Sequence, residues 1–368
     1  MKIIYLSNSK IPSEYANSVH VMKMCSAIAK LGHEVTLYAK RANNRAGNPY
    51  DLYGVEPDFL ISYFKSPPQK KKAKIRNILF RFKMRRRLIK CSADLIYTRN
   101  AKALSIIATL GKSFVIEQHA IPKNKGIVDK LFKSKNFKRL VVISESLKRD
   151  FLKIFSSLKP HLITVAHDAS DPVVINKKKL NAANGFHVGY VGSLYPGRGM
   201  EILEQLLKLC PWAHFHIVGG FGNGLTKWQE RLSSMRNVTF YGHVWHPKAM
   251  QLISCFDVVI APYQEKVSVP GGIDTSKWMS PLKIFEYMAC AKPMIVSDLP
   301  VLREVLSHEK NALLVPPDDS RAWFLAIKRY FEDPELMDRI SKQARHDLEI
   351  NYTWMERAKK VLNDLYTS

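Results

Sequence analysis

Short apolar runs alternate with amphipathic stretches along most of this chain. Residues 2–7 form an apolar run, which predicts a buried strand, and residues 19–31 carry apolar positions at helical spacing. Gly32 suits the C-terminal end of that helix, and the next apolar run, 33–39, predicts a second strand. A strand, loop, helix and strand in this order favour a doubly wound parallel sheet, so the predicted fold class is α/β.

A second pattern of the same kind begins at Phe186. Residues 187–193 predict a strand that enters a glycine-containing loop, and a helix follows from Met200. The preceding residues, 175–185, are polar, charged and without periodicity, which is typical of a linker. The sequence therefore predicts a first domain at 1–175, a second domain at 186–350 and a closing helical segment at 351–368.

The composition allows two domains and indicates an anionic partner. The 368 residues are 46% hydrophobic, enough for two cores, and the formal net charge is +25. Such a charge favours nucleic acid, anionic lipid or a phosphorylated ligand. The five cysteines show no metal-binding spacing, no apolar run is as long as a membrane span, and the first residues predict a strand rather than a signal peptide. We therefore expect free thiols and a cytoplasmic protein.

Residues 70–90 are rich in lysine and arginine and contain no acid. Apolar residues lie between the basic ones, largely at helical spacing, and a basic amphipathic helix is typical of a membrane-surface element. Each cation near an anionic leaflet contributes about 1 kcal/mol, so we expect peripheral association with the inner face of the cell membrane. A solvated basic face on a core helix is the alternative. Nucleic acid is a less favoured partner, because no aromatic-rich binding module accompanies the charge.

Residues 280–289 predict a helix that presents an anion site. Ser280 can cap the helix and Pro281 suits its first turn. The predicted packing face consists of Leu282, Phe285 and Ala289. Free N–H groups at a helix N-terminus bind anions, and Glu286, one turn deeper, can accept hydrogen bonds from sugar hydroxyls. The stretch thus predicts a pocket for a phosphorylated sugar or a nucleotide; the alternative is an ordinary helix with a surface glutamate.

This stretch resembles the donor-site helix of the retaining GT-B glycosyltransferases of glycosyltransferase family 4. That motif has two glutamates with a proline between them. The matching positions here are Pro281, Glu286, Met288, Ala289, Pro293 and Asp298. Trp278 replaces the first glutamate, which in the family contacts the transferred sugar, and Ala291 replaces a glycine. The resemblance covers nearly the whole chain and is strongest over 186–320.

The resemblance implies a fold and an activity. The GT-B fold has two doubly wound, Rossmann-like domains that face each other across a cleft, and a C-terminal helix that crosses back to the first domain. The implied reaction moves a hexose from a UDP- or GDP-linked sugar to an acceptor hydroxyl, with retention of configuration. No metal and no cofactor beyond the nucleotide-sugar substrate are expected.

The resemblance also implies roles for individual residues. His119, at the end of the predicted strand 114–119, would face the sugar and act in catalysis with Glu286, which would also hold the ribose beside Val244. The residues expected at the donor diphosphate are Gly192, Ser193, Arg198, Pro281, Leu282 and Lys283. Arg198 matches a family lysine by charge, whereas Ser193 stands where the family has an arginine. Three residues are possible sugar contacts in place of the missing glutamate: Asp274, Lys277 and Trp278.

The basic segment favours a membrane-bound acceptor, such as a lipid-linked saccharide in the synthesis of a surface polysaccharide or glycolipid. Two rival functions remain open from the sequence. One is a GT-B nucleotide-sugar epimerase, which needs no acceptor and no basic helix. The other is a non-catalytic relative that binds membranes or RNA, because Trp278 and Ser193 depart from the family pattern.

Overall fold

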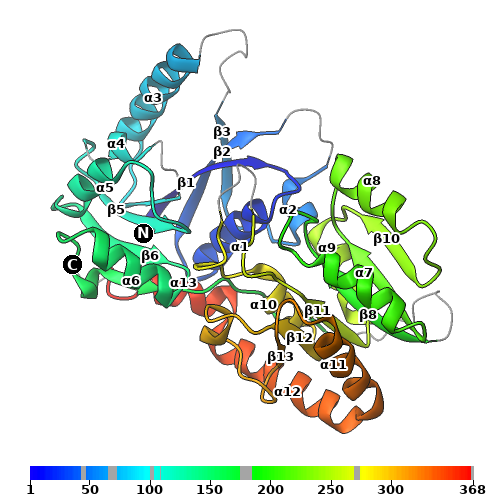
Figure 1. The fold of residues 1–368 in the computed structure, drawn as a ribbon. Coiled ribbons are helices and arrows are strands. Elements are labelled where there is room, and N and C mark those ends of the chain that lie inside the picture. Colours follow the sequence, from blue (N-terminus) through cyan, green and yellow to red (C-terminus); the bar gives the residue numbers. More distant parts are fainter. Residues whose placement is uncertain are drawn as a thin grey trace. The chain divides into compact units, whose positions relative to one another are not determined.

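The structure is a computed structural model of the chain (Figure 1). It describes residues 1–42, 47–64, 73–99, 103–107, 109–174, 185–268 and 274–365. These form two compact units: unit 1 comprises Met1–His167 together with Trp354–Ser368, and unit 2 comprises Asp168–Thr353. Each unit is an α/β sheet domain, and the α/β class with two doubly wound domains is confirmed.

Unit 1 is built on a seven-stranded parallel sheet in the order β3-β2-β1-β4-β5-β6-β7. Its strands are β1 (Lys2–Ile11), β2 (Glu34–Arg41), β3 (Leu60–Phe64), β4 (Leu95–Thr98), β5 (Ser113–Gln118), β6 (Phe137–Val142) and β7 (Ile163–Val165). The strand order reverses between β1 and β4. In open sheets of this kind ligands bind beyond the carboxyl ends of the strands at such a reversal.

The helices of unit 1 connect these parallel strands. They are α1 (Ala16–Lys30), α2 (Pro49–Tyr53), α3 (Ala73–Lys90), α4 (Leu104–Ile107), α5 (Lys125–Phe132), α6 (Glu145–Ile154), the 3-10 turn Pro160–Leu162 and α13 (Trp354–Leu362). The first helix begins at Ala16 rather than near 19, because the Ser18 hydroxyl donates to the Tyr15 carbonyl at 2.6 Å and closes an earlier turn. Gly32 follows α1 with φ 86°, as its predicted place after the helix requires.

Unit 2 has a six-stranded parallel sheet in the order β10-β9-β8-β11-β12-β13, which reverses between β8 and β11. Its strands are β8 (Phe186–Val191), β9 (Ala213–Val218), β10 (Val238–Gly242), β11 (Val258–Ala261), β12 (Met294–Ser297) and β13 (Leu313–Val315). Its helices are α7 (Met200–Leu209), α8 (Gly222–Arg231), α9 (His246–Cys255), α10 (Leu282–Ala289), the 3-10 turn Leu302–Glu304, α11 (Ser320–Glu332) and α12 (Pro334–Asn351).

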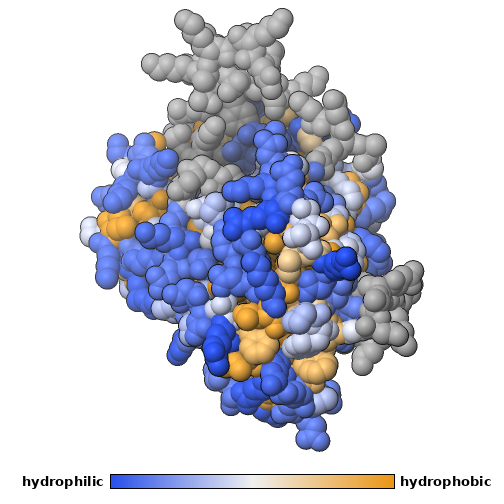
Figure 2. Space-filling model, turned by 45° about the vertical axis from the view of Figure 1, so that its right-hand side comes forward, coloured by the Kyte–Doolittle hydropathy of each residue, from blue (hydrophilic) through white to orange (hydrophobic). Residues whose placement is uncertain are grey.

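Two apolar cores cover the two faces of the unit 2 sheet. Neighbouring strand residues belong to different cores: Val259 lies in the core with α9 and α10, and Val258 in the core with α7 and α11. This alternation is the period-two pattern of a strand buried on both faces. Outside the cores, hydrophilic residues cover most of the face drawn in Figure 2.

The chain passes from unit 1 to unit 2 after His167, ahead of the predicted boundary at 175. The reason is local hydrogen bonding within unit 2. The Asp168 N–H donates to the Ser280 hydroxyl oxygen at 2.7 Å, and the Val173 N–H donates to the Ala289 carbonyl at 3.2 Å. Residues 175–184 of the predicted linker 175–185 lie outside the described part of the chain. The chain returns to unit 1 at Trp354, and α13 packs against α1, which confirms the predicted return of the closing helix.

The basic segment 70–90 forms α3 from Ala73 onward, while 70–72 lie outside the described residues. Met84 and Leu88 are fully buried, so one side of the helix packs on unit 1. Arg87 is held against the sheet, because its guanidinium donates to the Tyr63 carbonyl at 3.1 Å and to the Ser62 hydroxyl at 2.8 Å. No helix in the described part of the chain is long and apolar enough to cross a membrane.

Candidate active site

The backbone at the carboxyl end of β8 passes very close to a lysine from α10. Gly192 follows β8 with φ 150°, and a Cβ placed on it would lie 2.8 Å from the Lys283 Nζ. A Cβ on Gly219, at the end of β9, would lie 2.2 Å from the Gly192 carbonyl oxygen. Both positions therefore need glycine, and the bare backbone leaves room beside the lysine amine.

Lys283 is buried without a hydrogen-bond partner among the described residues. It lies in the first turn of α10, with 7% of its surface exposed. Its Nζ is 3.9 Å from the centre of the Tyr190 ring and 5.1 Å from that of Tyr263. Burial, and then the nearby Arg198 charge, lower the pKa of Lys283 well below its ordinary value. The rings are weak substitutes for an anion, so the amine has unmet hydrogen-bonding capacity.

Arg198 shares one of these aromatic neighbours. Its guanidinium carbon lies 5.4 Å from the centre of the Tyr263 ring, and its Nη1 is 3.5 Å from the Tyr263 hydroxyl. Its Nε is buried and, within the described chain, has no acceptor. The loop that carries it is fixed by Gly197 and Gly199, where a Cβ would lie 1.9 Å from the Lys266 carbonyl and 2.1 Å from the Pro262 carbonyl. The buried Lys283 and the half-buried Arg198 thus flank the same tyrosine ring, each with one donor atom unused in the described chain, which is the arrangement expected for an anion site.

The helix after these cations differs in detail from its prediction. Ser280 does not cap α10; its hydroxyl oxygen accepts from Asp168, and Pro281 takes the N-cap position. Glu286 is not a surface glutamate, because it is 9% exposed and its Oε1 lies 3.2 Å from His246 Nε2. The predicted packing face was too narrow: every residue from Lys283 to Ala289 is buried, whereas Leu282 is only half-buried.

The remaining predicted residues of unit 2 have local roles in the structure. The Ser193 carbonyl accepts from the Tyr190 hydroxyl at 2.7 Å. Val244 is half-buried and packs against the core that contains α10. The Asp274 carboxylate accepts the N–H groups of Val267 at 3.0 Å and Ser276 at 2.9 Å, so it shapes its own loop. Lys277 is exposed and Trp278 half-buried. Sugar contacts by Asp274, Lys277 and Trp278 remain predictions.

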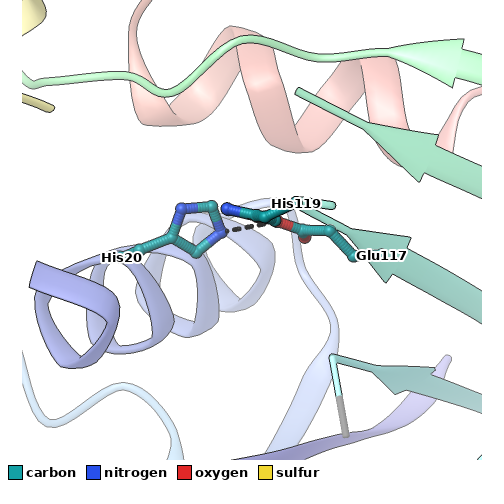
Figure 3. Close-up of side chains that lie close together, drawn as sticks. All are labelled: His20, Glu117 and His119. Carbon is teal, nitrogen blue, oxygen red and sulfur yellow. Dashed lines mark hydrogen bonds and ion pairs between the residues drawn. The ribbon is translucent and has the colours of Figure 1, made fainter. Parts of the chain in front are cut away.

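Unit 1 carries a second charged cluster around a buried glutamate (Figure 3). Glu117, near the end of β5, is 1% exposed, and its Oε1 lies 2.6 Å from His119 Nε2 and 3.0 Å from His20 Nε2. The same oxygen is 3.1 Å from Arg357 Nη2 on α13, while Oε2 accepts from the Tyr97 hydroxyl. Burial alone would raise the pKa of the Glu117 carboxyl, but the surrounding cations, above all Arg357, hold that pKa well below its ordinary value.

The hydrogen bonds fix the tautomer of His119. Arg99 Nη2 lies 3.1 Å from His119 Nδ1, and a guanidinium can only donate, so Nδ1 is an acceptor. The proton is therefore on Nε2 and is donated to Glu117. Both ring nitrogens of His119 are engaged within unit 1, although 28% of the side chain is exposed. Its predicted sugar contact is not tested by this geometry.

The same cluster has ligand types that could hold a metal ion. One donor atom from each of His20, Glu117 and His119 lies within 4.8 Å of the others. However, the shared Glu117 oxygen is already contacted by the Arg357 guanidinium, and Arg99 Nε lies 3.7 Å away. Two fixed cations at the coordinating oxygen repel a third, so the residues do not fit a metal ion.

Several residues of these clusters were missed by sequence reasoning. Tyr263 could have been found, because it lies just beyond β11, at the sheet edge where ligands bind. His20 lies inside a helix and Arg357 in the closing helix, far along the sequence from Glu117. Only the tertiary structure brings those two side chains to the carboxylate.

The family follows from comparison with known sequences. Residues 18–172 match the model described as Glycosyltransferase Family 4, and residues 185–333 match that described as Glycosyl transferases group 1. The chain belongs to the family 4 glycosyltransferases. The uncharacterized glycosyltransferase MJ1607 of Methanocaldococcus jannaschii is 25% identical over 61% of this chain and 59% of its own length. The O-antigen chain mannosyltransferase RfbU of Salmonella typhimurium is 43% identical over 17% of this chain and 18% of its own.

Solved structures show the fold of this glycosyltransferase. Anabaena HepE in complex with UDP superposes with a TM-score of 0.72 at 19% identity, over 100% of both chains. Sucrose-phosphate synthase from Thermosynechococcus elongatus superposes with a TM-score of 0.75 at 17% identity, over 100% of this chain and 98% of that one. These likenesses establish the GT-B fold. Among the curated relatives, the match to MJ1607 spans 59% of that protein and the match to Bacillus subtilis YtcC spans 47%.

Proposed function

We propose that this glycosyltransferase transfers a hexose from a UDP- or GDP-linked sugar to an acceptor hydroxyl. The observation that carries the proposal is the pair of basic side chains, buried Lys283 and half-buried Arg198, because Lys283 Nζ and Arg198 Nε lack acceptors among the described residues. A nucleoside diphosphate would supply the missing oxygens and negative charge. The complexes of HepE with UDP and with UDP and glucose support a uridine nucleotide over a guanosine one.

The chemical demand of this reaction is the charge on the departing diphosphate. Arg198 and Lys283 would stabilise that charge without a metal ion, and they are held in place before the reaction by glycine-lined backbone and tyrosine rings. Glu286, held by His246 within unit 2, would accept hydrogen bonds from the ribose. We propose retention of configuration, as the resemblance of the α10 motif implies, with His119 on the sugar side.

The acceptor we propose is a lipid-linked saccharide at an anionic membrane surface. Lys83, Arg85 and Arg86 are exposed on α3. Phe82 and Ile89, on the same helix, are 65% and 55% exposed, so apolar side chains accompany the charge. Similarity to an O-antigen mannosyltransferase supports a surface polysaccharide as the product. Pelleting with anionic liposomes that weakens as salt rises is the expected result; pelleting equally with neutral liposomes would contradict it.

The donor assignment is tested by thermal unfolding with UDP, GDP, ADP and their sugars. A nucleotide at about a hundred times its dissociation constant stabilises the fold by about 2.7 kcal/mol, which is a readily measured rise in Tm. We expect a rise with UDP or GDP. No rise with any nucleotide would favour the non-catalytic relative. Conversion of the sugar nucleotide to its epimer without an acceptor would instead identify an epimerase.

A further inference from the structure

The Glu117 cluster in unit 1 holds more positive than negative charge. Its single carboxylate faces two guanidiniums, Arg357 with Nη2 at 3.1 Å and Arg99 with Nε at 3.7 Å from Oε1. His20 and His119 can add no negative charge, whatever their protonation. The cluster therefore carries at least one unbalanced positive charge in a largely buried place, and such a charge favours an anion.

The two guanidiniums are not equally available. Arg357 is enclosed: its side chain is 2% exposed, its Nε donates to the His167 carbonyl at 2.8 Å, and its Nη2 reaches both Glu117 and the Ala166 carbonyl. Arg99 is less enclosed, with 14% of its side chain exposed. Its Nη2 is used by His119, whereas its Nη1 is buried and has no acceptor within the described part of the chain. The unmet donor of the two guanidiniums therefore belongs to Arg99.

The position of Arg99 fits a ligand site. Arg99 directly follows β4, and His119 lies just beyond β5, its parallel neighbour. Strand β4 also pairs with β1, where the strand order of unit 1 reverses. The carboxyl ends of strands at such a reversal are where open sheets bind ligands. The hydrogen bond to His119 and the nearby carboxylate also hold the guanidinium in one orientation.

We propose that Arg99 is the anchor of an oxyanion site in unit 1, which takes a phosphate or carboxylate group of the acceptor. The guanidinium supplies Nη1–H donors in a planar fork that suits either group. His119, with both nitrogens engaged, fixes the guanidinium rather than donating to the ligand. The assignment to the acceptor rests on the proposed function; the oxyanion site itself does not.

The test follows the arginine Nε–H signals of the 15N-labelled full chain by NMR. Potassium phosphate and sodium acetate are titrated separately, with sodium chloride adjusted to constant ionic strength. The Arg99 signal is assigned by its loss in Arg99→Lys. We expect the shift of that signal to reach a plateau with phosphate, with acetate or with both. The titration that reaches a plateau shows whether the site binds a phosphate or a carboxylate group. Arg231, paired at the surface with Glu204, is the internal control and should not move.

Two outcomes would overturn the site. One is an Arg99 signal that stays still in both titrations; the other is a shift that sodium chloride reproduces, which indicates general screening. The shift should persist in Lys283→Met, which removes the proposed diphosphate anchor of unit 2. In a second readout, Arg99→Met should lower phosphate affinity about tenfold, as for loss of a charged hydrogen bond.

The outcome is separable from that of the donor proposal. Arg99→Met should keep the nucleotide-induced rise in Tm, because the nucleotide anchors lie in unit 2. Loss of that rise would place Arg99 on the donor and overturn its assignment to the acceptor. Conversely, a wild-type chain that binds phosphate at Arg99 but no nucleotide would contradict the donor proposal and still support the oxyanion site.

Discussion

Each unit buries charged side chains where its strand order reverses, but the two clusters are balanced differently. In unit 1 the Glu117 carboxylate lies at the centre and its neighbours point at it. In unit 2 Lys283 and Arg198 lie beside tyrosine rings, and the carboxylate that acts on Lys283, that of Glu286, is held by His246. A satisfied cluster stabilises the fold, whereas an unsatisfied one costs stability until a ligand completes it. Within the described chain, the comparison therefore separates a cluster whose carboxylate holds most of its donors, with only Arg99 Nη1 left over, from a pair of cations that has no carboxylate partner of its own.

The largest expected effect is on unit 1. Glu117→Gln removes the carboxylate and leaves Arg99 and Arg357 without a counter-charge, so we expect a loss of about 3–5 kcal/mol in the free energy of unfolding. Urea unfolding followed by circular dichroism measures it. Glu204→Gln is the matched control, because it removes a carboxylate from a surface pair with Arg231 and should cost less than about 1 kcal/mol. Equal losses in the two variants would show that the cluster is not a structural centre.

The opposite behaviour is expected of unit 2. Lys283→Met removes a buried amine that has no acceptor, so Tm without nucleotide should stay level or rise. Nucleotide affinity should fall by about 1.5–3 kcal/mol, or roughly 10- to 150-fold, because a charged hydrogen bond to the diphosphate is lost. Isothermal titration with UDP or GDP measures the change. The exposed Lys277→Met is the control for loss of one positive charge, and an equal fall in that variant would indicate only long-range electrostatics.

The contrast between the clusters also shows what the sequence could and could not predict. Strand and helix order, the glycines beside Lys283 and the return of the closing helix follow from local patterns and from the family resemblance. The burial of Lys283 does not, because a lysine at the start of a helix is normally solvated. The cap was mispredicted for a similar reason: Ser280 is a good cap residue, but the distant Asp168 N–H takes its hydroxyl oxygen. Partners far apart in sequence decided both cases.

A smaller effect should appear in the pH dependence of nucleotide binding. Burial, and then Arg198, lower the pKa of Lys283, so its amine is neutral in the free protein at any pH above that lowered value. Bound diphosphate favours the ammonium and raises the pKa of Lys283, so binding takes up a proton. Affinity should then fall as pH rises between the two pKa values, by up to about 1.4 kcal/mol per pH unit.

Calorimetry in two buffers of different ionisation enthalpy measures that proton uptake. The arginine side chain in Lys283→Arg stays charged at every accessible pH. Nucleotide binding to this variant should therefore take up no proton, although the nucleotide still contacts a cation. If wild type and Lys283→Arg gave the same buffer dependence, the proton would come from another group, and Lys283 would be charged before binding.

The smallest effect is the order in which acid weakens the two units. In unit 2, burial, with the neighbouring His214 and His187, lowers the pKa of His216 to about 3. The unfolded chain takes up that proton below about pH 6.5, while the folded unit does not, so stability falls as pH falls, by about 1.4 kcal/mol at about pH 5.5. In unit 1 the lowered pKa of Glu117 also makes stability fall as pH falls. That fall begins only near pH 4.5, where the carboxyl of the unfolded chain starts to take up a proton.

Between about pH 6.5 and 4.5, His216 therefore weakens unit 2, whereas Glu117 leaves the stability of unit 1 unchanged. Hydrogen exchange resolves the units, and the core strands of unit 2 should lose protection first. His216→Gln keeps a donor and an acceptor for His187 and Tyr241 but cannot titrate, so it should flatten the acid slope of unit 2. Earlier loss of protection in unit 1 would mean that another group of that unit, such as His33, whose pKa is lowered by burial, governs its response to acid rather than the Glu117 carboxylate.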